Sequence, residues 1–239
     1  MARDFTSGSS ERILLSSAPA SAVPLTIAGW SRFDTAMTEG AEYTICAIDD
    51  PTTGHEFTVE IGRNGGVDYA IVVVTGASTQ VVTSSVAPLI NTWNHLCGVF
   101  TSSTSRDIYL NGTNVGNGTT NITPTVTETS IGATDQGASV GKFYDGQLAE
   151  IGIWTRVLTS AEITSLSQGF APSTIPQNLV FYAPLIGQNT PEATKIPNGT
   201  AMTMTGTTKY THPDFMKYPN KPSTGIRTRP AAFSPGLAR

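Results

Sequence analysis

Short apolar segments bounded by turn residues recur along most of this chain, and their spacing limits its fold more than any other feature. They begin roughly every ten to twelve residues and are rich in Val, Ile, Thr and aromatic residues, which favour β-strands. This spacing is typical of a β-sandwich or a barrel. The predicted strands are ERILLSS, PLTIAGWSRF, EYTICAID, HEFTVEIG, YAIVVVTG, TQVVTSS, WNHLCGVFTSS and RDIYLNGTNV.

Turn signals between these segments predict antiparallel hairpins. NGGV follows HEFTVEIG, and Asn111-Gly112 follows RDIYL. Asn-Gly favours a type I′ turn because both central residues need a positive φ. Within HEFTVEIG, the alternation places Phe57, Val59 and Ile61 on a common side, as in a strand with one face on a core.

The segment FYDGQLAEIGIWTRVLTSAEITSL combines a strand with a short helix. Thr159-Ser-Ala-Glu162 is a capping box, in which the Thr hydroxyl and the Glu carboxylate each satisfy a free backbone N–H. Ile163 and Leu166 form one apolar stripe, and Gly169 marks the expected end. Since a helix of about two turns is not stable alone in water, we expect it to pack on the strands.

The strand of this segment, GQLAEIGIW, has apolar residues at both side-chain parities. Strict alternation places Leu148, Glu150 and Trp154 on one face and Ile151 and Ile153 on the other. Because both faces hold large apolar residues, we expect the strand to be covered on both sides for part of its length.

The C-terminal stretch differs from the rest in charge and in proline content. Residues 205–239 contain six Lys and Arg against one Asp, a balance of +5, so in a chain of net charge −4 the other 204 residues carry −9. Five of the fifteen prolines follow residue 210, which rules out a regular strand or a long helix. A basic arm with spaced apolar residues predicts docking on a partner; the alternative is a tail folded back on its own domain or disordered. The partner-binding candidates are Lys217, Tyr218, Lys221, Ile226, Arg227, Arg229 and Phe233.

Three separated motifs resemble the laminin-G-like, concanavalin A-like jelly-roll domains. FTSGSSERILLSS with PLTIAGWSRFD is similar to their opening, WNHLCGVFTSSTSRDIYLNGTNVG to a central hairpin, and SIGATDQGASVGKFYDGQLAEIGIWTRVLTSAEITSL to their closing signature. The resemblance covers roughly residues 5–170 and implies two antiparallel sheets packed face to face, with the first and last strands as neighbours. It also implies that Trp30, Trp93 and Trp154 are core or core-edge residues rather than sugar platforms. The family often has Asp where Ala149 stands.

The predicted fold is therefore all-β: an antiparallel two-sheet jelly-roll sandwich of the concanavalin A-like type, with one short helix and an extended C-terminal arm. We assign residues 1–176 to the sandwich, 177–210 to additional strands packed on it, and 211–239 to the arm. NLVFYAPL in the second region is either an added strand or the remnant of a second repeat.

The sequence gives little support for catalysis. Laminarinase-type glycosidases of this fold superfamily need two carboxylates about 5 Å apart, commonly as E-x-D-x-E on one strand. Glu56 and Glu60 have this spacing, but Thr58 stands between them, and we interpret the stretch as a solvated strand face. The three histidines lack zinc-binding spacing, and His95 is expected to be structural. We predict a non-enzyme with no catalytic and no cofactor-binding residues.

Neither the cysteines nor the acidic residues predict a metal site. The two cysteines lack C-x-x-C spacing and are expected to be buried free thiols. The resemblance leaves calcium as an alternative, because laminin-G-like domains often bind it through loop acids, here Asp49, Asp50, Asp135 and Asp145. Apart from this calcium alternative, we predict no bound metal and no cofactor.

The expected function is that of a non-enzymatic structural protein of a tailed-phage virion, a capsid decoration or other accessory protein attached through its arm and a sandwich edge. Jelly rolls of this kind resemble accessory capsid and tail proteins. The expected partners are the major capsid protein or another virion protein, and further copies of this chain. A net charge of −4 and the lack of a membrane-length apolar stretch argue against nucleic acid and membranes.

Without an apolar signal segment, the protein is expected to be made in the host cytoplasm and to reside in the virion. Two alternatives remain. One is a carbohydrate-binding or adhesion module that uses loops at one end of the sandwich, and the other is a glycoside hydrolase.

Overall fold

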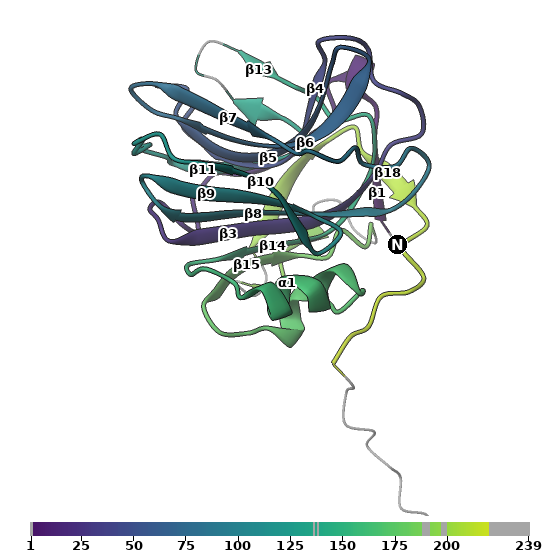
Figure 1. Cartoon of the computed structure of the whole chain (residues 1–239). Coiled ribbons are helices and arrows are strands. Elements are labelled where there is room, and N and C mark those ends of the chain that lie inside the picture. Colours follow the sequence, from purple (N-terminus) through teal and green to yellow (C-terminus); the bar gives the residue numbers. More distant parts are fainter. Residues whose placement is uncertain (1, 136, 138, 188–191, 197–199, 220–239) are drawn as a thin grey trace, which may run out of the picture.

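Two antiparallel β-sheets packed face to face form the body of the molecule (Figure 1). The computed structural model describes residues 2–135, 137, 139–187, 192–196 and 200–219. The predicted all-β sandwich with one short helix is confirmed. Sheet A has the order β10 (Thr113–Gly118), β9 (Ser105–Leu110), β8 (Asn94–Ser102), β3 (Leu25–Arg32), β14 (Gly146–Trp154), β1 (Ala2–Phe5) and β18 (Thr208–Tyr210), and β15 (Leu179–Ala183) also pairs with β14.

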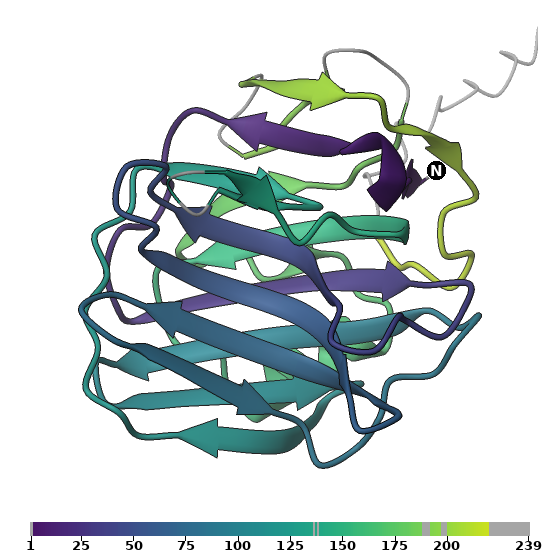
Figure 2. The same cartoon turned by 90° about the horizontal axis from the view of Figure 1, so that it is seen from above.

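Sheet B lies over sheet A, as the second view shows (Figure 2). Its order is β16 (Glu192–Ala193), β17 (Ala201–Thr205), β2 (Arg12–Leu15), β11 (Glu128–Ile131), β4 (Glu42–Asp49), β5 (Glu56–Asn64), β6 (Val67–Thr75) and β7 (Thr79–Thr83). A separate hairpin is formed by β12 (Thr134–Asp135) and β13 (Val140–Gly141), and the helical elements are η1 (Ser7–Ser9), α1 (Ser160–Ser167) and η2 (Pro172–Thr174).

The main core lies between the two sheets, where alternate side chains of each strand meet. Phe57 of β5 and Phe100 of β8 pack edge to face across this interface, with ring centroids 5.2 Å apart. Gly98 of β8 leaves room for its neighbours, since a Cβ there would lie 2.8 Å from methyl groups of Val59 and Val72. The predicted core face of β5 is confirmed.

The turns also follow the sequence signals. Asn111 and Gly112 have φ values of 50° and 85°, as a type I′ turn requires, and they join β9 to β10. The hairpin between β5 and β6 turns at Gly65-Gly66. Trp154 and Trp30 are buried.

Strand β14 contains a bulge that the alternation of its residues does not predict. Its residues Ala149 and Gly152 lie opposite Trp30 and Ala28 of β3, so three steps on one strand match two on the other. Glu150 takes up the extra residue with a φ of 57°, a left-handed conformation that is uncommon outside glycine.

The bulge changes which side chains face the core. Leu148, Ile151 and Ile153 belong to the main core, whereas Trp154 belongs to a second apolar cluster on the outer face of sheet A. The predicted shared face of Leu148 and Trp154 is therefore wrong, because strict alternation fails at a bulge. The expectation that both faces are covered is confirmed, since all nine residues of β14 are buried.

Helix α1 covers part of the outer face of sheet A (Figure 1). Its N-cap Thr159 accepts a hydrogen bond from the backbone N–H of Glu162, whose carboxylate accepts one from the backbone N–H of Thr159, so the predicted capping box is confirmed. Ile163 and Leu166 are buried against Trp154. This packing holds a helix that is too short to be stable alone.

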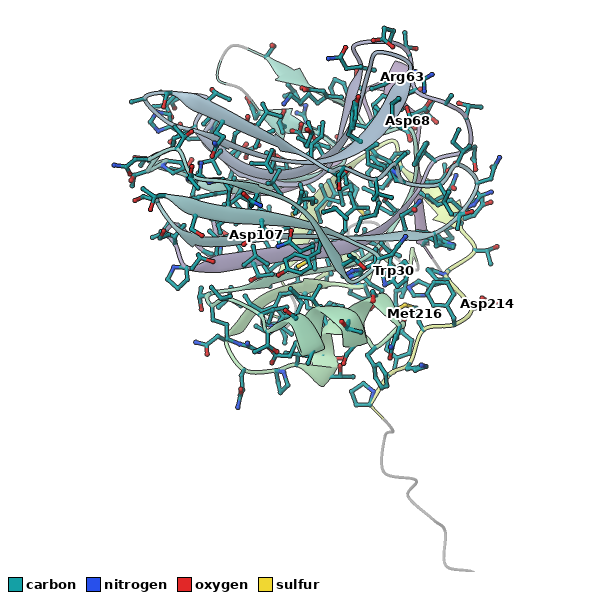
Figure 3. All side chains as sticks on the ribbon, in the orientation of Figure 1. Trp30, Arg63, Asp68, Asp107, Asp214 and Met216 are labelled. Atoms are coloured by element: carbon teal, nitrogen blue, oxygen red, sulfur yellow. The ribbon has the colours of Figure 1, made fainter. Side chains whose placement is uncertain are left out.

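The chain returns to its beginning near the C-terminus. Strand β1 lies between β14 and β18, and Ala2 is opposite Tyr210. The following residues, 211–219, run over the outer face of sheet A (Figure 1), where Met216 packs with Trp30 in a small apolar cluster (Figure 3). This part of the predicted arm folds back on its own domain, and residues 220–239 lie outside the described part of the chain.

Candidate functional site

Three carboxylates are buried on the outer face of sheet B, which otherwise faces away from the core. Asp49 lies at the end of β4, and Glu56 and Glu60 alternate with the core residues of β5. The predicted solvated strand face at Glu56 and Glu60 is wrong, because both side chains are almost fully buried. Buried carboxylates cost stability unless they are paired, so their partners define the site.

Lys142, which follows β13, pairs with two of the acids of this face. Its Nζ lies 3.1 Å from both carboxylate oxygens of Glu60 and 3.0 Å from Oε2 of Glu42. Burial raises the pKa of Glu60 to about 7, against the opposing effect of the Lys142 ammonium. Burial alone would lower the pKa of Lys142, but the carboxylates of Glu60, Glu56 and Glu42 raise it above its ordinary value. Lys142 therefore stays charged.

The β12–β13 hairpin brings Lys142 to this position. The backbone N–H of Thr44 donates to the carbonyl of Lys142, and the backbone N–H of Asp135 donates to Oδ2 of Asp49 at 2.8 Å. Burial raises the pKa of Asp49 to about 7, and the nearby charge of Glu128 adds to the shift. The hairpin thus covers the β4 side of the outer face and leaves the β6–β7 side open.

Two adjoining hollows occupy the open side. The first, of about 500 Å³, lies near the β5–β6 turn, and the second, of about 480 Å³, lies beside the hairpin. Both are lined by Glu42 and Val81, so the two hollows adjoin at these residues, and together we call them the sheet B groove. The first is also lined by Arg63, Asn64, Tyr69, Ile71 and Thr83, and the second by Thr53, Glu56, Val73, Thr75, Thr79 and Lys142.

A row of polar groups crosses the floor of this groove. Glu56, Thr75 and Thr79 are direct neighbours on β5, β6 and β7. The hydroxyl of Thr79 donates to that of Thr75 at 3.3 Å, which donates to Oε1 of Glu56 at 3.1 Å. In the next row, Val73 and Val81 give an aliphatic surface. The groove thus alternates hydrogen-bonding and apolar strips.

The first hollow ends at a charged hairpin. Nη1 of Arg63 donates to Asp68 at 2.8 Å, and both residues lie on the sheet B side of the molecule, away from α1 (Figure 3). The hydroxyl of Tyr69 donates to the carbonyl of Asn64. These contacts fix the side chains at this end before any ligand binds.

The described residues contain no group of three or more His, Cys, Asp or Glu side chains arranged to hold a metal ion. The loop acids considered for calcium make other contacts: Asp50 accepts hydrogen bonds from the backbone N–H groups of Thr52 and Thr53, and Asp145 accepts one from Ser7. In the same part of the chain, no helix is both long and apolar enough to cross a membrane. His95 is buried against Trp30, and burial lowers its pKa to about 3.

Of the predicted partner-binding residues, the structure describes Lys217 and Tyr218, and both lie far from the groove, on the sheet A side. Lys217 places its ammonium 4.7 Å from the centre of the Phe170 ring, and its backbone N–H donates to Gly169. The hydroxyl of Tyr218 donates to the Glu150 carboxylate at 2.7 Å. The other predicted residues, Lys221, Ile226, Arg227, Arg229 and Phe233, are outside the described part of the chain.

The residues of the groove could not be identified from the sequence, because the acids of the groove come from separate strands. Glu42, Glu56 and Lys142 are brought together only by the pairing of β4 with β5 and by the hairpin. One signal was available: Glu56 and Glu60 share a strand face, and two acids on an apolar strand are unusual.

Comparison with known protein families and structures agrees with the β-sandwich described above. The model of the family described as the concanavalin A-like lectin/glucanases superfamily matches residues 7–164. No match was found among curated proteins.

Several solved structures are similar to this chain at low sequence identity. A presumed carbohydrate-binding protein of Bacteroides ovatus is 19% identical, with a TM-score of 0.66 over 90% of this chain and 61% of its own length. The heptameric SAP-like pentraxin of Limulus polyphemus is 14% identical, with a TM-score of 0.57 over 70% of this chain and 81% of the pentraxin. The CBM40 of a Ruminococcus gnavus IT-sialidase, bound to α2,3 sialyllactose, is 14% identical, with a TM-score of 0.52 over 62% and 84% of the two chains.

Proposed function

Because this chain belongs to the concanavalin A-like lectin/glucanases superfamily, we propose that it is a non-catalytic carbohydrate-binding module that holds an extended glycan in the sheet B groove. This replaces the expected loop site at one end of the sandwich with a site on the face of a sheet. Two of the similar structures are named for carbohydrate binding, which supports this class of ligand.

The observation that carries the proposal is that the two hollows adjoin at Glu42 and Val81. With volumes of about 500 and 480 Å³, they offer more room than one sugar ring needs, which suits a chain of several residues. Sugar rings present apolar C–H faces and hydroxyl edges, and the groove offers a matching aliphatic strip beside its row of threonine hydroxyls and the Glu56 carboxylate.

The positions of the two acids on β5 favour binding over hydrolysis. A glycosidase needs both carboxylates at the bond that is cleaved. Glu56 lines the second hollow, but Glu60 is fully buried and its two oxygens accept hydrogen bonds from Lys142. Glu56 is itself almost fully buried and Thr58 stands between the two acids, so the strand lacks the pair of accessible carboxylates that this reaction needs.

Val81 offers the sharpest test, because it lines both hollows and its side chain is 49% exposed. We expect Val81→Arg to block the groove without disturbing the core. Val67→Arg is the matched control, since Val67 is 44% exposed on the neighbouring strand and does not line the groove. Glycan-array binding followed by titration calorimetry should show at least a tenfold loss for Val81→Arg only. Equal binding by both variants would place the glycan elsewhere.

A structural role in a virion is a second and more specific proposal. Segment 211–219 brings the chain to the surface of sheet A at Tyr218, and the sequence after it holds four basic residues, which would bind a capsid protein or further copies of this chain. Deletion of residues 220–239 keeps the docked segment, so the sandwich should stay folded while attachment to particles is lost. Attachment by the truncated protein would contradict this role.

A further inference from the structure

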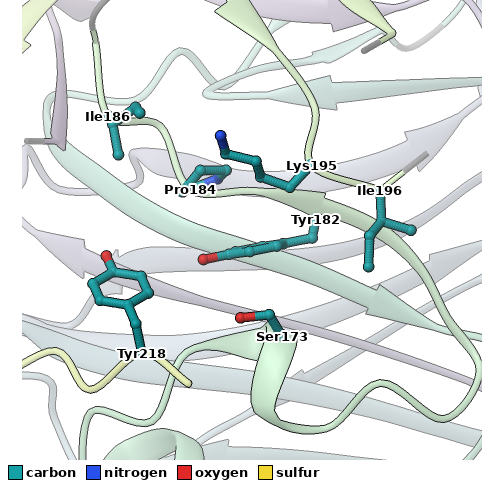
Figure 4. A pocket seen from close by; sticks show the side chains of 7 residues that line it. All are labelled: Ser173, Tyr182, Pro184, Ile186, Lys195, Ile196 and Tyr218. Carbon is teal, nitrogen blue, oxygen red and sulfur yellow. The ribbon is translucent and has the colours of Figure 1, made fainter. Parts of the chain in front are cut away.

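A pocket of about 470 Å³ lies on the outer face of sheet A, on the opposite side of the sandwich from the sheet B groove. It is lined mainly by apolar and aromatic side chains (Figure 4), among them Tyr182, Pro184, Ile186, Ile196 and Tyr218. This volume lies within the range of small-molecule sites, which are commonly apolar with a few polar groups. The function proposed above makes no use of it.

The two tyrosines of this pocket are held by one buried carboxylate. Glu150 is 1% exposed and accepts hydrogen bonds from the hydroxyls of Tyr182 at 2.6 Å and Tyr218 at 2.7 Å. Nε2 of His212 lies 2.9 Å from the same carboxylate. Glu150 therefore has its partners within the protein and acts on the pocket by fixing two rings that lie 36 residues apart in the sequence.

The backbone of β14 is adapted to this arrangement. β1 pairs with β14 up to Leu148, and β15 pairs with it from Ile151, so Glu150 stands at the fork between the two strands. The bulge gives Glu150 its left-handed φ of 57° and turns its side chain to the outer face. A non-glycine residue held in this conformation, with a buried charge, is typical of positions where the local geometry serves a site.

The polar groups at the pocket come from two further elements. Ser173 of η2 lies on one side of the Tyr182 ring, and Lys195 reaches over the hollow with its ammonium directed toward Pro184 and Ile186 (Figure 4). Lys195 is exposed and forms no ion pair with any of the described residues. An apolar pocket with one available cation is complementary to a ligand that has an apolar ring and a single negative group.

We propose that this pocket binds a small aromatic carboxylate, with its ring against Tyr182 and Tyr218 and its carboxylate on Lys195. Aromatic rings pair favourably in offset or edge-to-face geometry, and fixed rings lose little entropy when a ligand binds. The carboxylate would form a charge-assisted hydrogen bond with the ammonium. A polyhydroxylated sugar would leave its hydroxyls unpaired against the isoleucines, so the apolar lining selects against it.

Titration calorimetry on the full chain tests this with 3-phenylpropanoate and its uncharged amide. We expect saturable binding of the carboxylate and about tenfold weaker binding of the amide. Lys195→Met should reduce carboxylate binding to the level of the amide, whereas Lys209→Met, at an exposed lysine on β18, should behave as wild type. Ile186→Trp should fill the pocket and remove binding of both probes.

The inference fails if the wild-type chain shows no saturable binding of the carboxylate, if it binds the amide equally well, or if Lys195→Met changes nothing. Because Lys195 is a surface residue, its variant should fold even if Ile186→Trp does not. Val81→Arg, which blocks the sheet B groove, should leave 3-phenylpropanoate binding unchanged. Loss of glycan binding and loss of carboxylate binding are thus separable.

Discussion

The ring of Phe215 lies on the ring of Trp30, with centroids 4.7 Å apart and planes at 58°. Trp30 belongs to β3, in the middle of sheet A, and Phe215 belongs to the segment that follows the last strand. The contact fixes the C-terminal segment on the sandwich and covers a tryptophan that would otherwise face water. Side-chain contacts, rather than a strand ladder, hold most of this segment.

Phe215→Ala should release the segment. We expect the free energy of unfolding to fall by about 1–2 kcal/mol, less than for a core phenylalanine because Phe215 is 40% exposed. Amide hydrogen exchange of residues 211–219 should accelerate, and Trp30 fluorescence should shift to longer wavelength. Val157→Ala, another exposed apolar residue of the sheet A side, is the control. Unchanged exchange in Phe215→Ala would show that other contacts hold the segment.

The contributions of the adjacent residues Asp49 and Asp50 to stability should change with pH in opposite directions. Burial raises the pKa of Asp49 to about 7, so the folded state holds this proton more tightly than the unfolded chain does. Its contribution is fully present below the unfolded pKa of about 4 and is lost as the pH rises to about 7, by at most about 1.4 kcal/mol per pH unit. Asp49→Asn should flatten this slope in urea unfolding between pH 4 and pH 8.

Asp50 is the matched control for Asp49. Hydrogen bonds from the backbone N–H groups of Thr52 and Thr53 lower its pKa, so its contribution is present above the unfolded pKa and is lost as the pH falls. Asp50→Asn should therefore lower stability at neutral pH, where Asp49→Asn raises it. The same sign for both variants would contradict the different surroundings of the two carboxylates.

The N-cap of α1 should contribute measurably to stability. Thr159→Ala removes the acceptor for the backbone N–H of Glu162, and we expect a loss of about 1 kcal/mol. Ser160→Ala, at the next position, should cost little. Thermal or urea unfolding monitored by tryptophan fluorescence measures both. A comparable loss in both variants would mean that the capping box does not set the stability of the helix.

The same helix start should make stability sensitive to acid. The side-chain hydrogen bonds from Arg156 lower the pKa of Glu162 to about 2, with help from the backbone N–H of Thr159. Its contribution is present above the unfolded pKa of about 4.3 and is lost as the pH falls toward 2. The difference between wild type and Glu162→Gln should therefore shrink between pH 6 and pH 2.5. A constant difference over this range would refute it.

The two thiols should be unreactive in the folded protein. Cys46 and Cys97 are fully buried and free, and burial raises the pKa of each thiol. Because the thiolate is the reactive form, a disulfide reagent should modify neither residue at pH 8 until denaturant is added, after which both should react. Fast reaction of one equivalent in native buffer would show local opening of a sheet.

Local signals were sufficient to predict most of the sandwich. Three predicted features depend only on residues close together in the sequence, and all three are present. They are the capping box at Thr159, the Asn111-Gly112 turn and the core face of β5. Strands β1 and β18 were missed because MARDF and TKY carry little periodicity. β1 is a strand because β14 offers it an edge at Gln147 and its neighbours, and β18 in turn pairs with the other edge of β1.

The candidate sites depend on contacts that local patterns do not encode. Glu56 and Glu60 are expected to be solvated because apolar and polar residues alternate along their strand. The hairpin that carries Lys142, more than 80 positions away in the sequence, nevertheless covers them. The bulge at Glu150 similarly overrides alternation in β14, and its tyrosine partners come from later segments. Predicting either site requires the tertiary pairing of strands distant in sequence.

The pairing of Ala2 with Tyr210 has a mechanical consequence for a protein anchored at its ends. Tension applied to two residues that lie directly opposite each other opens an antiparallel ladder one hydrogen bond at a time, instead of shearing all of its bonds together. Once segment 211–219 had been detached from sheet A, the β1–β18 pair would therefore separate at low force, while β3, β8 and β14 stayed paired. In such a molecule the β1–β18 pair would open before the faces of the two sheets were distorted.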